Sequence, residues 1–358
     1  MSRWGTVTVV ALLILVSWSR AAHAETEDDP HPKWGDRTLA GHTFIDPQIA
    51  PSGLVTTHVG IRQGVLFRRV PDYPLGPFGS LTLMQVGADE SLDFGLKLSD
   101  HVGLYGNLHL TIHAGMNAES ILLLPTYSTF AGESGAVIRL ARFEETGTQL
   151  SLRLGGEVSR GYVLQLSALL SEVITSVEQG NVQTFLDVAN GDIAKYVLWP
   201  TEGASGKAWL CGAQALGPYI SLQLGLGARY GRFHEHPYKS EQGARVDAEA
   251  TQHAYVGSLA IAVDGAPGDV PIGAVAEWRT TRQSTRRSLL GAEETEGETE
   301  HVAAGGLYYT GRRNLQVGVG LTAQLNQRPE QGFDPAGKPA DSGTPTSVTG
   351  SFVLRYVW

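Results

Sequence analysis

The sequence has 358 residues, with 44 glycines, one cysteine and a formal net charge of −9. A single cysteine, Cys211, excludes an intramolecular disulfide, so the fold must be stabilised by other means. The acidic balance argues against a nucleic-acid partner, because binding to phosphates requires a surplus of Lys and Arg.

The first 24 residues have the plan of a secretory signal peptide. Arg3 supplies the basic start, an apolar run extends over residues 7–16, and the small residues Ala22 and Ala24 suit a cleavage site. The apolar run is about half the roughly 20 residues that a membrane-spanning helix needs. We therefore expect export with cleavage after Ala24. Residues 25–53 are acidic and Pro-rich at first, and the sequence leaves open whether they stay in the periplasm or form a plug.

Apolar and polar residues alternate through most of the chain after residue 53. In SLDFGLKL (91–98), for example, every second residue is Leu or Phe, which predicts a strand with one apolar face. The predicted strands are about ten to twelve residues long, close to the roughly 9–11 of a tilted strand that crosses a bilayer and longer than most strands of soluble sheets. Interrupted alternation in three of them leaves ten or fourteen strands as alternatives to the twelve we expect. The predicted strands are 54–69, 91–98, 102–113, 135–143, 147–158, 206–214, 218–230, 251–263, 271–283, 299–310, 314–325 and 345–358.

The connections between these strands alternate between short and long. Short turns are expected near 99–101, 144–147, 215–217, 264–270 and 311–313. Long loops are expected over 70–90, 114–134, 159–205, 231–250, 284–298 and 326–344. Short turns on the periplasmic side and long loops outside are typical of an outer-membrane barrel.

The longest predicted loop contains two stretches with apolar residues at helical spacing, YVLQLSALLSEVITSVEQ and TFLDVANGDIAKYVLWP. These stretches predict two short amphipathic helices, either folded into the barrel mouth or packed on its rim. A period-2 reading of Tyr162, Leu164 and the residues up to Leu170 predicts an additional strand instead.

The sequence ends in TSVTGSFVLRYVW, in which apolar residues occupy every second position: Trp358, Tyr356, Leu354, Phe352 and, more loosely, Val348. This strand resembles the C-terminal targeting signal of bacterial outer-membrane β-barrel proteins. The resemblance implies a transmembrane antiparallel up-and-down β-barrel in the bacterial outer membrane, with lipid and the barrel-assembly machinery as partners. In broad outline the chain is similar to mid-sized transporter and channel barrels, a group that includes the hydrocarbon and fatty-acid porins.

If the Leu and Val stripes face lipid, the opposite strand faces line the interior. That lining is polar and contains more basic than acidic residues, which favours small anions or polar solutes. Alternatively, its opposite charges pair across the lumen and fill it. The predicted inward residues are Arg62, Asp93, Lys97, Tyr105, Asn107, His109, Arg139, Arg153, Glu157, Gln223, Arg229, Glu277, Arg279, Gln316 and Arg355.

These features favour a passive channel or transporter for small polar or anionic solutes. The alternatives are a non-catalytic anchor of a surface assembly for adhesion, motility or polysaccharide export, and a transporter of hydrophobic compounds. We expect no enzyme and no cofactor, because outer-membrane lipases and deacylases use a His-x-Ser pair that the sequence lacks; the nearest match is His109 and Thr111. The His234-Glu235-His236 stretch is a weak metal signal, and we expect a solvated loop there.

Overall fold

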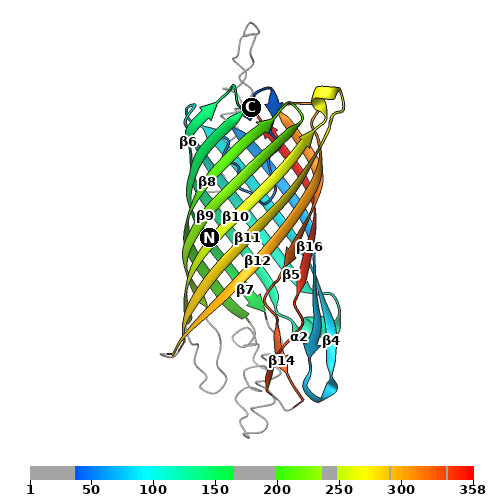
Figure 1. Ribbon diagram of the computed structural model, residues 1–358. Coiled ribbons are helices and arrows are strands. Elements are labelled where there is room, and N and C mark those ends of the chain that lie inside the picture. The colour runs from blue at the N-terminus through cyan, green and yellow to red at the C-terminus, as the bar shows by residue number, and fades with distance from the viewer. Residues whose placement is uncertain (1–36, 165–197, 236–247, 290–291, 336–337) are drawn as a thin grey trace, which may run out of the picture. The chain divides into compact units, whose positions relative to one another are not determined.

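A computed structural model describes residues 37–164, 198–235, 248–289, 292–335 and 338–358, which form a closed antiparallel barrel of twelve strands (Figure 1). The barrel and the predicted strand number are confirmed. Each barrel strand pairs with its neighbours in the chain, and the last closes the ring on the first, from Val357 opposite His58 to Thr346 opposite Arg69. Closure leaves no strand edge unpaired. The strands are β3 (His58–Pro74), β4 (Ser80–Lys97), β5 (Val102–Gly115), β6 (Thr126–Phe143), β7 (Thr148–Leu164), β8 (Leu198–Leu216), β9 (Ile220–Glu235), β10 (Ala248–Asp264), β11 (Ile272–Leu289), β12 (Ala292–Tyr309), β13 (Leu315–Leu325) and β16 (Thr346–Val357).

Most strands are longer than the sequence predicted, so several predicted loops are wrong. The predicted loop 70–90 consists mainly of β3 and β4, joined through the 3-10 turn η1 (Gly76–Phe78). Of the predicted loop 284–298, residues 284–289 belong to β11 and residues 292–298 to β12, and β6 begins at Thr126. Hydrophobic alternation ends where the outer surface becomes polar, but backbone hydrogen bonding between strands continues past that point. The pattern therefore marks only the apolar part of each strand.

Other corrections concern the ends of the predicted elements. The first barrel strand begins at His58 rather than at residue 54. Tyr162 and Leu164 lie at the end of β7 and form no additional strand, whereas the predicted helical stretches lie almost wholly in 165–197, outside the described residues. The connection after β13 contains a small hairpin, β14 (Gln331–Phe333) with β15 (Pro339–Asp341).

The helical content of the described part is small. One short helix, α2 (Ala118–Leu123), connects β5 to β6, with Asn117 capping its N-terminus by accepting a hydrogen bond from Ser120. Among the described residues, no helix is both long enough and apolar enough to cross a membrane.

The outer surface of the barrel carries large exposed apolar side chains on its strands. Leu226, Leu321 and Val65 are 67%, 62% and 51% exposed, although such residues are normally buried. A contiguous apolar surface of this kind marks contact with a membrane or a partner. Further members of this outer surface are Phe67, Phe94, Leu104, Leu108, Ile112, Phe130, Leu154, Leu210, Leu224, Ile261, Leu307, Val319, Phe352 and Leu354.

The N-terminal part of the described chain, residues 37–57, lies against the inner wall of the barrel. It contains two short paired strands, β1 (Thr38–Leu39) and β2 (His42–Thr43). Its apolar side chains form clusters with inward-facing residues of the strands, such as Phe44 with Ala213 and Ile45 with Val275. Three of the four buried apolar clusters among the described residues therefore lie between this segment and the wall, and the fourth, around Val70 and Leu83, packs β3 and β4 against the end of α2.

The segment contacts the part of the ring that β7, β8 and β9 form. His42 Nδ1 lies 2.8 Å from the carbonyl oxygen of Pro218, in the turn after β8, and Gln149 on β7 donates to the carbonyl of Gly53 at 2.8 Å. On the neighbouring strand β9, a Cβ placed on Gly225 would lie 2.9 Å from Pro51. Glycine at that position thus permits the close approach between segment and wall. We call residues 37–57 the inner segment.

Candidate functional site

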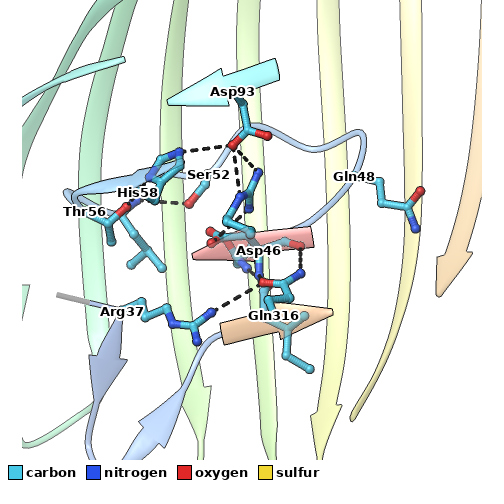
Figure 2. A network of polar contacts seen from close by, with 12 residues as sticks. Arg37, Asp46, Gln48, Ser52, Thr56, His58, Asp93 and Gln316 are labelled. Carbon is cyan, nitrogen blue, oxygen red and sulfur yellow. Dashed lines mark hydrogen bonds and ion pairs between the residues drawn. The ribbon is translucent and has the colours of Figure 1, made fainter. Parts of the chain in front are cut away.

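The inner segment is joined to the wall by a largely buried ionic cluster centred on Arg355 of β16. Figure 2 labels its other members, Asp46, Asp93 and His58. Arg355 Nη1 lies 3.0 Å from Asp46 Oδ2, and Arg355 Nη2 lies 2.8 Å from Asp93 Oδ2 on β4. His58 Nε2 lies 3.2 Å from the same Asp93 oxygen. One guanidinium thus bridges a carboxylate of the inner segment and a carboxylate of the barrel.

Two further groups hold Asp46 in place. The side-chain amide of Gln316 donates to the carbonyl oxygen of Asp46 at 3.1 Å and accepts from its N–H at 3.2 Å. The same Gln316 oxygen accepts from Arg37 Nη1 at 3.4 Å, as Figure 2 shows. Burial opposes ionisation of Asp46, but the guanidiniums of Arg355 and Arg37 outweigh it and hold the pKa of Asp46 below its usual range. Asp46 is therefore a buried carboxylate stabilised in its charged form.

Glu277 on β11 binds the inner segment through three consecutive backbone amides. Its carboxylate accepts hydrogen bonds from the N–H groups of Gln48 at 2.6 Å, Ile49 at 2.8 Å and Ala50 at 3.0 Å. Glu277 is only 6% exposed, so these bonds form away from solvent. Hydrogen bonds to an ionised acceptor are about twice as strong as neutral ones, which makes this contact a second anchor for the segment.

Gln48 provides a third contact between the inner segment and the wall. Its side-chain N–H group donates to the Tyr308 hydroxyl at 2.8 Å, and its side-chain oxygen accepts from Ser351 at 3.3 Å. The Gln48 carbonyl accepts from Arg62 Nη1 at 3.4 Å, and Arg62 Nη2 lies 3.2 Å from Asp89. The polar groups of the segment are thus matched by polar groups from at least five barrel strands.

A separate charged group lies on β5 to β8. Lys207 Nζ lies 2.8 Å from Glu133 Oε2 and also contacts Glu157. Arg153 Nη2 lies 3.6 Å from Glu133 Oε1, and its guanidinium carbon is 3.5 Å from the centre of the Tyr105 ring. In this part of the interior the opposite charges pair, as in the alternative that the sequence left open.

Space remains inside the barrel beside these groups. One cavity of about 820 Å³ lies between the inner segment, at Gln48 and Ile49, and the connection after β13, at residues 327–330. A second, of about 400 Å³, is lined by residues 46–52 together with both charged groups. Arg279 and His109 line both cavities. The interior therefore has room for a small solute.

The remaining predicted inward residues occupy different places. Asn107 and Arg229 line the smaller cavity. Gln223 is buried and donates to the Ile45 carbonyl at 3.0 Å. Arg139 is also buried, whereas Lys97 lies at a short turn, where its ammonium is 2.7 Å from Asp100. Lys97 thus contributes to a turn and lines neither cavity.

Sequence reasoning missed several charged residues of the interior, among them Asp89, Glu133, Lys207 and Glu300. Asp89 and Glu133 fell in predicted loops, and Lys207 fell in a strand with interrupted alternation. Strand parity would have found them, because Asp89 lies four residues before Asp93 and therefore shares its face. The interior contains more carboxylates than the predicted set.

The predicted metal signal involves residues at the edge of the described chain. His234 Nδ1 lies 3.9 Å from Glu249 Oε1, and His236 is outside the described residues. Within the ranges that the structure describes, no three His, Cys, Asp or Glu side chains are grouped as metal ligands.

The predicted assembly strand, β16, has its aromatic residues on the outer face at the short-turn end. Tyr356 and Trp358 are partly exposed, with ring centres 5.4 Å apart, and the Trp358 N–H donates to the carbonyl of Thr57 at 3.0 Å. Leu354, Phe352 and Val348 are exposed on the same face. This face continues the apolar outer surface.

Comparisons with known proteins found similar structures but no similar sequences. No protein-family model matches the chain, and no curated protein matches it. The structure is similar to the translocator domain of the autotransporter NalP from Neisseria meningitidis, with 11% identity, 85% of this chain and 89% of that chain covered, and a TM-score of 0.49. It is also similar to an outer membrane channel from Pseudomonas putida F1, with 12% identity, 88% of this chain and 100% of that chain covered, and a TM-score of 0.45. The P. putida toluene transporter TodX is also similar, with 10% identity, 86% of this chain and 91% of that chain covered, and a TM-score of 0.38. These similarities assign no solute and no residue role.

Proposed function

We propose that this chain is an outer-membrane channel for small polar solutes, and that the inner segment closes the channel at its short-turn end. The observation that carries the proposal is the combination of a closed barrel, an apolar outer surface and a polar interior that still contains a cavity of about 820 Å³. Barrels of this build are stable where lipid covers their outer surface and water fills their interior.

The outer-membrane location rests on the sequence and on the outer surface together. The expected signal peptide directs export, and the alternating strands carry apolar residues such as Leu226 and Leu321 outward. The aromatic rings of Tyr356 and Trp358 suit the interface between lipid and water. If the proposal is correct, high salt alone leaves the protein in the membrane fraction, and boiling changes its gel mobility. Release by salt, or mobility that boiling does not change, would contradict a membrane barrel.

The inner segment is proposed as the closing element because its anchors lie around the ring. Arg355, Glu277 and Gln316 contact it from β16, β11 and β13, and Gln149 contacts it from β7. Solute passage past the short turns then requires the segment to shift. Weakening its anchors is expected to increase conductance.

Planar-bilayer recording tests this function directly. Wild-type protein is compared with Glu277→Gln, which weakens the three-amide contact, and with Glu157→Gln, a matched luminal carboxylate that touches no residue of the inner segment. We expect larger or more frequent openings for Glu277→Gln and wild-type behaviour for Glu157→Gln. Absence of conductance in all three proteins would contradict a channel.

The second candidate is a non-catalytic anchor of a surface assembly. The observation that favours it is the number of ties between the inner segment and the wall, because a barrel that never opens needs such ties and no pore. The same recordings separate the two functions: an anchor stays silent even when Glu277 is replaced. The polar lining of both cavities does not favour a transporter of hydrophobic compounds.

A further inference from the structure

Charge pairing in the barrel interior is incomplete: among the described residues that line the smaller cavity, Arg229, Arg279 and one carboxylate, Glu300, form no salt bridge. In the smaller cavity, the carboxylates of Asp46 and Asp93 pair with Arg355, and those of Glu133 and Glu157 pair with Lys207. These contacts leave two cations of the same lining, Arg229 and Arg279, without a carboxylate at salt-bridge distance among the described residues. A cation inside a protein is normally paired, because its removal from water is costly.

Arg279 is the clearest case. Its side chain, on β11, is partly buried, its Nε atom is fully buried, and in the part of the chain that the structure describes Arg279 makes no side-chain hydrogen bond. The guanidinium borders both cavities. Glu300 and Glu277 influence it electrostatically without contacting it. An arginine in this state has five donors ready for an acceptor that is not part of the barrel.

Two further arginines lie near Arg279. Arg229 on β9 lines the smaller cavity with Arg279, Arg62 on β3 lines the larger one with it, and both repel its guanidinium electrostatically. Arg229 donates to the side-chain oxygen of Gln252, a neutral partner, and the Nε atom of Arg62 is buried without a hydrogen-bond partner although its Nη2 pairs with Asp89. Three guanidiniums that repel one another are stabilised when an anion binds between them.

The neighbouring wall provides space for such an anion. Positions that border the larger cavity near Arg279 carry small or medium side chains, including Val302, Thr322, Thr349 and Ser351. Val302 lies directly opposite Arg279 in the pairing of β11 with β12. Short side chains at these positions leave free volume in the cavity that Arg279 also lines.

We propose that Arg279, together with Arg229 and Arg62, binds a small oxyanion, a carboxylate or a phosphate, inside the barrel. The planar guanidinium matches two oxygens of such a group with two parallel hydrogen bonds, which a chloride ion cannot accept in the same way. The site would give the channel its solute class, and in that role it rests on the proposed function. Binding itself does not require conduction, so the two can be tested separately.

Isothermal titration calorimetry on the full-length protein in detergent tests the site. The probes are potassium acetate, inorganic phosphate and potassium chloride in a buffer without other small anions. We expect wild type to bind acetate or phosphate more tightly than chloride, and Arg279→Gln to weaken that binding at least about tenfold, because it removes a charge-assisted bidentate contact. Arg229→Gln is expected to weaken it less, and Arg279→Lys to keep the charge but lose part of the oxyanion preference.

Arg160→Gln is the matched control, because it removes one arginine whose side chain is 61% exposed and pairs with Glu202. It should bind as wild type does, and a shift of gel mobility on boiling equal to that of wild type shows that each variant forms the barrel. Equal binding by wild type and Arg279→Gln, equal affinity for chloride, or no binding of either oxyanion by wild type overturns the proposal. Conduction without oxyanion binding would contradict the proposed site and support the channel. Oxyanion binding without conduction would support the site and contradict the channel.

Discussion

Replacement of Glu277 by Gln should loosen the inner segment without disturbing the barrel. The carboxylate accepts three buried N–H groups, two of them, from Ile49 and Ala50, at the same oxygen. A Gln side chain keeps one acceptor oxygen, loses the negative charge and turns an N–H group toward the remaining donor. At least one hydrogen bond is lost and the others lose their charge assistance.

The magnitude follows from these bonds. A net hydrogen bond to a charged group contributes about 1.5–3 kcal/mol, and a buried donor left without an acceptor costs about 1–3 kcal/mol. We therefore expect docking of the segment to weaken by about 2–4 kcal/mol. Because about 1.4 kcal/mol corresponds to a factor of ten, local opening should become roughly 30 to 1,000 times more frequent.

Hydrogen exchange followed by mass spectrometry measures this opening on peptides that cover residues 45–52. Exchange of the amides of Gln48, Ile49 and Ala50 should accelerate by that factor in Glu277→Gln, while peptides from the barrel strands keep their wild-type rates. Glu157→Gln, which changes a luminal carboxylate that pairs with Lys207, should leave residues 45–52 unaffected. Acceleration of less than about threefold in Glu277→Gln would show that Glu277 does not anchor the inner segment, because it corresponds to less than one lost hydrogen bond.

Three further predictions concern the ionic cluster and the outer face. Arg355→Met leaves the buried carboxylate of Asp46 and the partly buried one of Asp93 without their shared cation, so the free energy of unfolding should fall by about 3–5 kcal/mol, seen as barrel unfolding at lower urea concentration, with Arg160→Met close to wild type. The pKa of Asp46 is held below its ordinary value of 3.8, so its contribution to docking is complete above that pH and is lost as the pH falls toward the lower folded value. Protection of residues 45–52, measured as exchange relative to the intrinsic amide rate at each pH, should therefore fall on acidification, less steeply in Asp46→Asn; equal slopes would contradict the assignment. Trp358→Asp places a charge where an aromatic ring suits the interface, so less protein should reach membranes in heat-modifiable form, whereas Ser99→Asp at another short turn should have no such effect.

The barrel could be predicted from the sequence because its cause is local. A strand between lipid and a polar interior must alternate, and stretches such as SLDFGLKL show that alternation within eight residues. Such stretches, together with three less regular ones, predicted the strand number that the structure confirms. The strand ends could not be found in this way, since β11 and β12 continue as polar strands beyond the apolar surface.

The charged pairs of the interior could be predicted only in part from the sequence. The sequence placed Arg153 and Glu157 on an inward face but omitted Glu133 and Lys207, which pair with them. Whether opposite charges meet depends on which strands are neighbours and in what register, and neither is written in the periodicity of a single strand.

That the chain forms strands with an apolar outer face and a polar inner one follows from the sequence alone, because the alternation is repeated within most of the predicted strands. Only the tertiary structure decided what lies inside the barrel. The inner segment has no periodic pattern, and its partners Glu277, Gln316 and Arg355 are more than 200 residues away in the chain. Several of its contacts use backbone amides and carbonyls, which every sequence possesses, so closure of the ring was needed to bring their partners within reach.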